Sequence, residues 1–339
     1  MLMRRRSLLA IAAGVIVGLA VITFGVLYLI PSGDYILLPD RAHPVAPLVR
    51  VQGGHEPSGP GQILFVDVLE RRASELESLF PWLHDGATLV PANLLVPPGV
   101  SDQAARQADL RAMQVSQQIA AAVALRHLGY HVVAKPSGVI VAELEAGSNA
   151  ERVLRPQDVI VAVNGVRTPT IAKLRSVLAP VHAGDVVTLR VRRGTQLLTV
   201  RVKTIPSPVE KGRAIVGFAP DQAANIKLPI NVQIDAGNVG GPSAGLAFTL
   251  QVLEELGHDV THGYTVAATG EIELNGAVTP IGGVRQKIFG VRAAGAQVFL
   301  VPAGDNAAIA RRYAGNVRVI AVSSFAQALR ALAKLPPKR

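Results

Sequence analysis

Apolar and polar positions divide the 339-residue chain into distinct kinds of segment. An unbroken apolar run covers residues 8–30, and a stretch rich in Pro and Gly continues to Gln62. Residues 102–128 repeat apolar positions at helical spacing, which predicts a long amphipathic helix. Short β-branched runs and turn residues alternate over 129–205, which predicts a small β-rich domain. Strand and helix patterns then alternate to residue 335, which predicts an α/β or α+β domain.

The predicted architecture is therefore multi-domain, and a chain of this length can bury two modest cores. Ser74 and Glu77 stand at capping-box spacing, which predicts the start of a helix. We expect five segments: a cytoplasmic stub with a transmembrane anchor (1–33), a linker (34–62), an α/β segment with the long amphipathic helix (63–128), the β-rich domain (129–205) and the α/β domain (206–335).

The apolar run from Leu8 to Ile30 is long enough to cross a bilayer, because about 20 helical residues span the hydrocarbon core. It is longer than the apolar part of a cleaved signal peptide, and the following "IPSGDY" offers no convincing cleavage site. The basic triplet at 4–6 precedes the run, and the positive-inside rule keeps such an N-terminus in the cytoplasm. We expect a single-pass protein of the cell membrane with most of its mass outside the cytoplasm.

Composition excludes several classes of function. The chain has no cysteine, which rules out disulfides, thiolate metal sites and a cysteine nucleophile. Its net charge is +10, but basic residues are scattered, as in "RVRRGTQLLTVRVK", and aromatic residues make up only 4%. A nucleic-acid platform needs clustered charge and stacking rings, so we expect no nucleic-acid partner. No GxxxxGK[ST] motif is present, and we expect no ATP, no other cofactor and no metal.

The β-rich segment resembles the PDZ family in "LGYHV" (128–132) and in "GVIVAELEAGSNAERVLRPQDVIVAVNG". It departs from the family's PGSPA turn at 146–150 and from Gly-Asp at Gln157. The resemblance implies a groove that takes an extended peptide as an added strand, with its terminal carboxylate held by backbone N–H groups. Gly129 can equally be the C-cap of the preceding helix. The implied peptide-binding loop consists of Leu128, Gly129, Tyr130 and His131.

The stretch "GNVGGPSAGL" (237–246) places a serine just before the small residues of a predicted helix. Three interpretations are open: a serine in a tight turn, a helix N-cap, or a nucleophile held at an exposed helix start. Free amide groups and the positive end of the helix dipole converge at Ser243, where they would stabilise an oxyanion. Such a nucleophile needs a base that removes its proton.

Few residues can be that base. His262 lies in a loop pattern with no acid in a matching position, which gives a Ser-His-Asp triad weak support. Lys287 lies one turn into a helix predicted after 282–283, with Ile288 and Phe289 beside it. Apolar surroundings there would desolvate the amine and lower its pKa, and a neutral lysine can act as a general base.

Three ordered motifs, "GGPSAG", "ATGEIELNGAVTPIGG" and "VRQKI", resemble the proteolytic domain of Lon proteases, serine peptidases of family S16 with a Ser-Lys dyad. The resemblance covers 215–332. It implies that Ser243 is the nucleophile, Lys287 the base, and Thr269 a hydroxyl that holds the lysine amine. It also implies an oxyanion site formed by the backbone of Gly240, Gly241 and Ala244.

The whole arrangement is similar to bacterial membrane-anchored, PDZ domain-containing Lon-like proteases. ATP-dependent members have an acidic residue where this chain has Gly240, and they carry an ATPase in place of the anchor and PDZ module. The resemblance implies an ATP-independent endopeptidase for protein or peptide substrates, and a homo-oligomer, commonly a hexamer. The alternative is a catalytically silent scaffold whose PDZ groove binds partner proteins. Glu271 and Glu273 are expected to belong to a solvated or structural strand face.

Overall fold

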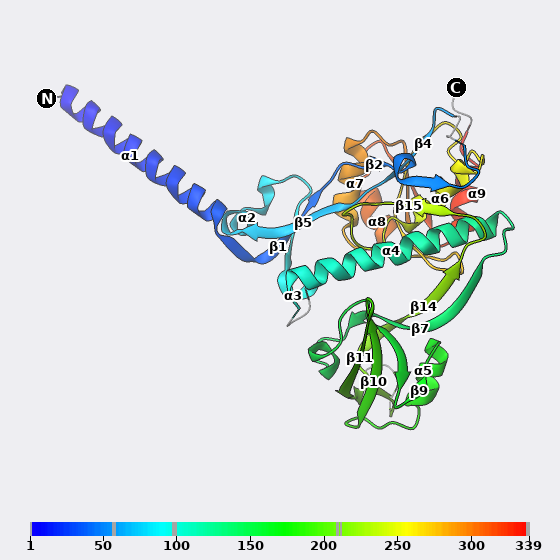
Figure 1. Ribbon diagram of the computed structural model, residues 1–339. Helices are drawn as coiled ribbons and strands as arrows, with labels where there is room; N and C mark the ends of the chain where they lie inside the picture. Colours follow the sequence, from blue (N-terminus) through cyan, green and yellow to red (C-terminus); the bar gives the residue numbers. More distant parts are fainter. Residues whose placement is uncertain (1, 56–58, 97–99, 208–209, 211, 337–339) are drawn as a thin grey trace.

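Helix α1 (Leu2–Leu29) projects away from the rest of the molecule (Figure 1). The computed structural model describes residues 2–55, 59–96, 100–207, 210 and 212–336, with side chains from residue 14 onward. Within those residues, no helix combines the length and the apolar character needed to cross a membrane. The first part of the predicted anchor, 8–13, and the basic triplet at 4–6 lie outside the described side chains. The transmembrane anchor therefore stays a prediction.

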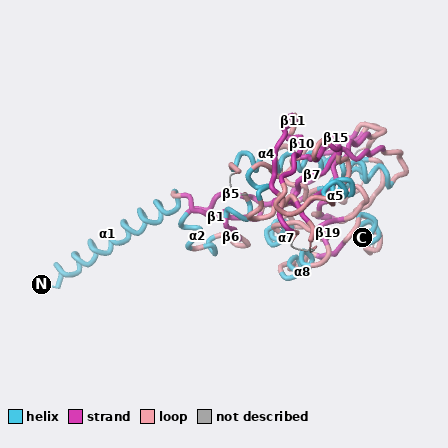
Figure 2. The backbone as a smooth tube through the Cα atoms, turned by 90° about the horizontal axis from the view of Figure 1, so that it is seen from below, coloured by secondary structure: helices cyan, strands magenta, loops and turns pink. Residues whose placement is uncertain are grey.

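A small antiparallel sheet lies at the base of α1, with the strand order β5-β1-β6 (Figures 1 and 2). The strands are β1 (Pro31–Pro39), β5 (Val68–Ser74) and β6 (Thr88–Pro91). Short helices α2 (Glu75–Leu79) and α3 (Ala92–Leu95) connect them to the following segments. The predicted capping box is confirmed, because Ser74 Oγ accepts from Glu77 N and the Glu77 carboxylate accepts from Ser74 N.

The segment expected to be a linker (34–62) forms strands instead. Most of β1 lies in it, followed by β2 (His43–Pro44) and β3 (Val49–Val51), while β4 (Gln62–Phe65) starts at its end. Pro and Gly residues suggested a spacer, but several apolar residues between them, among them Ile36, Val45 and Val49, are buried. The structure differs from the expectation because these residues pair with other strands, and two of the partners come from distant parts of the chain: β3 pairs with β15 (Val232–Ile234), and β4 pairs with β16 (Thr265–Ala268).

A five-stranded sheet of order β2-β4-β16-β19-β20 forms the centre of the C-terminal domain. Apart from the edge strand β2, its neighbouring strands are parallel; β19 is Val298–Pro302 and β20 is Arg318–Val322. Ile63 and Phe65 of β4 face one buried cluster, and Leu64 faces the other, so both faces of the sheet are covered. Helices α6 (Gly245–Glu255) and α9 (Phe325–Leu332) cover the first face; α7 (Val284–Ala293) and α8 (Asp305–Arg312) cover the second. The domain is mixed α/β, as predicted.

The long amphipathic helix is α4 (Asp102–His127), and it packs against α6 (Figure 1). Its buried side chains include Met113, Ala120 and Val123, which join the core cluster around α6. The segment 63–128, expected to stand apart, thus supplies a central strand and a helix to the C-terminal domain. The helical period predicted α4 itself, but it could not name the surface on which α4 packs.

The β-rich domain is inserted between α4 and β15. Strand β7 (Val133–Leu144) enters it and β14 (Phe218–Lys227) leaves it, paired antiparallel along their length as a two-stranded ribbon. The order of the main sheet is β11-β10-β8-β7-β14, with β9 beside β8. The other elements are β8 (Val159–Val163), β9 (Val166–Arg167), α5 (Ile171–Leu178), β10 (Val186–Arg193), β11 (Gln196–Lys203), β12 (Ile205–Pro206) and β13 (Ala214–Ile215). Two short hairpin strands of the C-terminal domain are β17 (Glu271–Ile272) and β18 (Val278–Thr279).

Candidate active site

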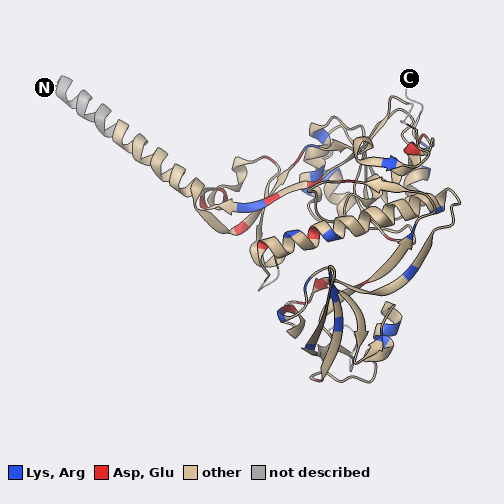
Figure 3. Ribbon diagram, viewed as in Figure 1, with Lys and Arg blue, Asp and Glu red and all other residues tan. Residues whose placement is uncertain are grey.

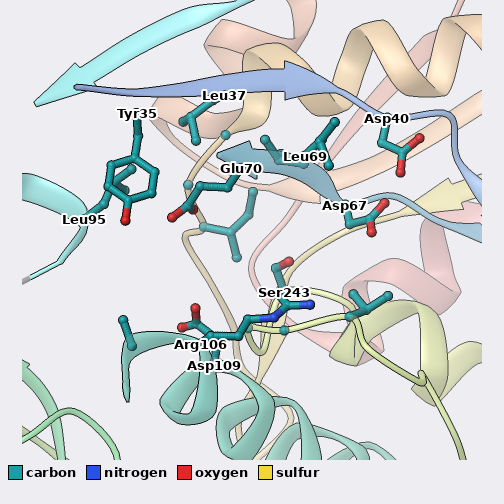
Figure 4. Close-up of a pocket in the computed structure, with 18 of the residues that line it drawn as sticks. Tyr35, Leu37, Asp40, Asp67, Leu69, Glu70, Leu95, Arg106, Asp109 and Ser243 are labelled. Carbon is teal, nitrogen blue, oxygen red and sulfur yellow. The ribbon is translucent and has the colours of Figure 1, made fainter. Parts of the chain in front are cut away.

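A cavity of about 850 Å³ lies between the N-terminal sheet, α4 and the loop before α6 (Figure 4). Strands β1 and β5 form one side and α4 the opposite side, with Ser243 between them. Residues 238–243, Glu271, residues 280–283 and Lys287 complete the lining. Residues of both the N-terminal and C-terminal parts of the chain therefore surround Ser243.

Ser243 does not act as a helix cap. Helix α6 begins at Gly245, its N-cap is Ala244, and no side chain forms a capping hydrogen bond there. Instead, Ser243 Oγ accepts a hydrogen bond from Lys287 Nζ at 2.5 Å. The N-cap interpretation is thus excluded, while the position at the start of an 11-residue helix suits an oxyanion.

Lys287 is buried on the first full turn of α7. Its backbone N–H donates to the carbonyl of Gly283, and only 3% of the residue is exposed. Its amine donates to Thr269 Oγ1 at 3.1 Å as well as to Ser243. Burial lowers the pKa of Lys287 to about 8, and the nearby charge of Asp67 acts in the opposite direction. A sizeable fraction of this amine is neutral near pH 8, as a general base requires.

Thr269 joins the lysine to the nucleophile's backbone. It follows β16 and is fully buried. Its hydroxyl accepts from Lys287 and donates to the Ser243 carbonyl at 3.1 Å, while Gly270 N donates to the same carbonyl at 2.8 Å. The structure therefore brings Ser243, Thr269 and Lys287 together from three separate elements.

The oxyanion donors differ from those expected. Gly241 N–H donates to the carbonyl of Asp109 at 2.9 Å, so it is already engaged, and Pro242 has no N–H. The N–H groups of Ser243 and Ala244 have no acceptor within the described part of the chain. These two amides just before α6 are therefore the available oxyanion donors. The expected role of Gly241 is corrected, because its N–H already forms a hydrogen bond with a carbonyl of α4.

The close approach of α4 explains why a glycine occupies position 240. A Cβ at this position would lie 2.7 Å from the Cβ of Asp109, closer than real side chains approach. A residue with a side chain at position 240 therefore requires α4 or the nucleophile loop to shift. Arg106 donates to the Asn238 carbonyl, and Ser116 Oγ donates to the Pro242 carbonyl at 2.9 Å. Helix α4 thus holds the loop that carries the nucleophile.

Six carboxyl groups that were not predicted from the sequence line the cavity: Asp40, Asp67, Glu70, Asp102, Asp109 and Glu271. Four of them, Asp67, Glu70, Asp109 and Glu271, have raised pKa values in common. Burial raises the pKa of each, that of Glu271 to about 7. Glu271 was expected on a solvated or structural strand face, and the structure places it in the cavity lining instead. Glu273 is absent from that lining. No local pattern marks these residues, because they meet only in the folded chain.

Two other candidate groups lie apart from the dyad geometry. Among the residues that the structure describes, Asp40, His43 and Asp67 bring potential cation ligands within 4.8 Å of one another, which is a grouping that could hold a metal. His262, the weaker candidate base, lies outside the cavity lining, with its Nδ1 3.9 Å from Asp259. Lys287 is therefore the basic side chain placed against Ser243.

The predicted peptide-binding loop lies at the end of α4. Leu128 is the helix C-cap, Gly129 has a φ of +83°, and Tyr130 N donates to the carbonyl of Leu125. This geometry matches the C-cap interpretation of Gly129. Strand β7 pairs with β8 only at 139–140, so the loop lies at the far end of the β7–β14 ribbon from the main sheet. Peptide binding by Leu128 to His131 stays a prediction.

Comparison with known proteins identifies two domains. Residues 204–334 match the family model for the Lon protease (S16) C-terminal proteolytic domain, and residues 126–204 match the PDZ domain. The chain is 34% identical over 149 residues to Lon protease 2 of Bacillus subtilis (strain 168), covering 42% of this chain and 26% of the relative.

Two further relatives are also Lon proteases, and they too are matched over only part of their length. Lon protease 1 of Sorangium cellulosum is 36% identical over 109 residues, covering 29% of this chain and 13% of the relative. Lon protease 2 of Thermus thermophilus is 32% identical over 133 residues, covering 35% of this chain and 16% of the relative. The chain spans about a quarter or less of the length of these relatives. It carries a PDZ domain and a Lon-type S16 proteolytic domain within a mixed α/β fold.

Proposed function

We propose that the protein is an ATP-independent serine endopeptidase with a Ser243-Lys287 dyad. The observation that carries this proposal is the 2.5 Å hydrogen bond from Lys287 Nζ to Ser243 Oγ, made by an amine that is 3% exposed. The match of residues 204–334 to the S16 proteolytic domain supports a serine peptidase. The absence of a P-loop motif from the sequence supports independence from ATP.

In the proposed reaction, Ser243 Oγ attacks a peptide carbonyl while neutral Lys287 accepts its proton. Lysine then passes this proton to the departing amine, which leaves an ester on the serine. Water attacks the ester, gives a proton to Lys287, and releases the new carboxyl end of the substrate as Ser243 regains its proton. The amides of Ser243 and Ala244 stabilise the oxyanion, and Thr269 holds the amine in place.

The substrates proposed here are extended or unfolded protein segments, because an enzyme without an ATPase does not unfold its substrates. We further propose that the PDZ domain selects or gates such segments through an extended or C-terminal peptide. Its insertion between α4 and β15 supports a gating role, since α4 holds the nucleophile loop and β15 leads into it. A homo-oligomer, a hexamer by family resemblance, completes this proposal.

The proposed location is the cell membrane, with the N-terminus in the cytoplasm and the catalytic domain outside. The uncharged apolar run from Leu8 to Ile30 supports it, as do exposed apolar side chains such as Ile16 and Ile22 along α1. Alkaline carbonate should leave the full chain in the membrane pellet and release a chain lacking residues 1–30. Protease added to intact spheroplasts should digest the catalytic domain; its full protection would reverse the proposed orientation.

The dyad is tested by covalent trapping. The full chain is treated with a serine-reactive phosphonate, and the adduct is mapped by mass spectrometry. We expect labelling of Ser243, loss of labelling in Ser243→Ala and Lys287→Ala, and full labelling in Ser176→Ala and Lys334→Ala, which change exposed side chains. A catalytically silent scaffold predicts no adduct on Ser243 and no cleavage of unfolded casein, and that result would retire the peptidase proposal.

A further inference from the structure

The cavity around Ser243 contains carboxylates that lack partners. Asp67, Glu70, Asp109 and Glu271 line it, and none of them forms an ion pair within the described residues. One oxygen of Asp67 is buried without a hydrogen-bond partner. The whole chain carries a net charge of +10, so this local excess of acid runs against its average composition.

The cations of the same cavity are engaged elsewhere. Arg71 binds both carboxylate oxygens of Glu77, and Arg72 binds both oxygens of Asp102. Arg106 donates to the backbone of the nucleophile loop. The charge of Arg106 lowers the pKa values of Glu70 and Asp109, but burial outweighs it and their pKa values remain raised. One arginine thus faces two carboxylates and leaves Glu271 without a neighbouring cation.

These carboxylates come from separate elements that line the cavity around Ser243. Glu70 projects from β5 and Asp109 from α4, on opposite sides of Ser243 in Figure 4. Glu271 lies on β17 and also lines the cavity. Figure 3 shows acidic positions on β5 and α4, while lysine and arginine are spread over both domains. A peptide lying past Ser243 therefore brings its side chains between these acids.

Asp67 and Glu271 are half-buried, whereas Glu70 and Asp109 are exposed on the cavity surface. A cation brought by a ligand is attracted to all of these unpaired carboxylates, and for the half-buried ones it also offsets the cost of desolvation. Lysine and arginine side chains reach such groups with long apolar stems and donate charge-assisted hydrogen bonds. A neutral side chain leaves the carboxylates unpaired, and an acidic one adds repulsion. The cavity is therefore complementary to a basic side chain.

We propose that this site selects substrates with a lysine or arginine beside the scissile bond, and that Glu70, Asp109 and Glu271 determine this specificity. The inference rests on the proposed function of Ser243 as a nucleophile, and it names the substrate class of that same site. Asp67 is set apart from the three, because its charge acts on Lys287.

The test uses quenched fluorescent peptides of one sequence that carry Lys, Gln or Glu in turn at each position flanking the cleaved bond. With the full chain, kcat/KM should be about tenfold higher for the best Lys peptide than for its Gln counterpart, as expected for one charge-assisted contact. Glu70→Gln and Glu271→Gln should each bring this ratio towards one. Glu143→Gln removes an exposed carboxylate outside the cavity and should leave the ratio unchanged.

A binding measurement separates this inference from the proposed function. Dye-labelled Lys and Gln peptides are titrated against the Ser243→Ala chain, and fluorescence anisotropy gives the two Kd values without turnover. Tighter binding of the Lys peptide supports the inference even if the parent chain cleaves nothing, which would overturn only the peptidase proposal. Equal affinity, or cleavage with no preference for Lys, overturns the inference. Glu70→Lys adds an independent check: this variant should bind the Lys peptide less tightly than the parent does, and the Glu peptide more tightly.

Discussion

The two walls of the cavity are built in different ways. The wall that carries Ser243, Thr269 and Lys287 comes from three short motifs of the C-terminal domain, and its contacts are between 2.5 and 3.1 Å. The second wall has two parts, β1 and β5 on one side of Ser243 and α4 on the other, and it supplies acidic side chains and the supports of the nucleophile loop. Proton transfer demands fixed residue types at fixed positions, which leaves a motif in the sequence. A binding surface demands only shape and charge, so it leaves none.

The largest expected effect comes from removing the base in the wall that carries Ser243, Thr269 and Lys287, which we call the motif wall. Lys287→Met keeps the length and apolar contacts of the side chain but removes the proton acceptor, so kcat should fall about ten-thousandfold. The measurement is single-turnover hydrolysis of an activated ester or peptide substrate. Lys334→Met, on the exposed surface of the same domain, should leave kcat within about twofold, a change of less than about 0.5 kcal/mol that is usual at such surface positions. Activity retained in Lys287→Met would show that another group accepts the proton.

The second prediction concerns the stability of the β1–β5 side of the second wall. The Glu77 side chain is buried and binds Arg71, His84 and Ser74, and the Arg71 hydrogen bonds hold its pKa well below the usual carboxyl range. Glu77→Ala should destabilise the region around β5 and α2 by about 3 kcal/mol, because it leaves the former partners of the carboxylate without an ion pair or hydrogen bond. Hydrogen exchange of β5 and α2 amides measures the loss, with Glu75→Ala in the same helix as the control.

The sign of the pH dependence follows from the lowered pKa. The folded state favours ionised Glu77, so its stabilisation is complete above the unfolded carboxyl pKa of about 4.3. It is lost as the pH falls from there through the lower pKa of the folded state. The difference between parent and Glu77→Ala should therefore be constant near neutral pH and shrink in acid. A difference that grew in acid would contradict the ion-pair account.

A smaller effect is expected where the two walls touch. Gly240→Ala places a Cβ 2.7 Å from Asp109, so the nucleophile loop or α4 has to move. A shift of this kind next to Ser243 should lower kcat/KM about tenfold to a hundredfold. Gly33→Ala on β1 meets no atom within 4 Å and provides the matched control. Equal activity of the two variants would show that the close packing of α4 has no catalytic consequence.

The smallest expected effect concerns the charge interaction between Asp67 in one wall and Lys287 in the other. Asp67 raises the pKa of Lys287, against the larger lowering by burial. Asp67→Asn should therefore move the acid limb of the rate profile to lower pH, while Glu273→Gln should leave it in place. A shift of the limb to higher pH would mean that the Asp67 charge does not stabilise the lysine cation.

Much of the motif wall and of its fold was predictable from the sequence. Local patterns identified α4, the capping box at Ser74 and the alternating strands and helices, because each depends on residues close in the chain. The meeting of Ser243 and Lys287 followed from ordered motifs. The strands in 34–62 were missed because Pro and Gly dominated the local pattern, and because the partners of β3 and β4 lie about 180 residues or more away.

The other misses share one cause. Gly241 was a reasonable oxyanion donor until α4 was placed, since its N–H is taken by the carbonyl of Asp109. Glu271 looked like an ordinary strand residue, and only the fold shows that its face lines the cavity. The insertion of the PDZ domain between α4 and β15 is likewise a property of pairing between distant strands. A sequence pattern predicts the conformation of residues that are close in the chain, whereas these features depend on contacts between distant segments.

The most direct test of the central claim is the pH dependence of acylation at Ser243, followed as the rate of phosphonate labelling of the full chain from pH 6 to 10. Neutral Lys287 is the active form, so the rate should rise with one ionisation and level off above the pKa of about 8. Correction for the pH dependence of the phosphonate's own hydrolysis isolates the enzyme term. A corrected profile that stays flat over this range would contradict a buried lysine base.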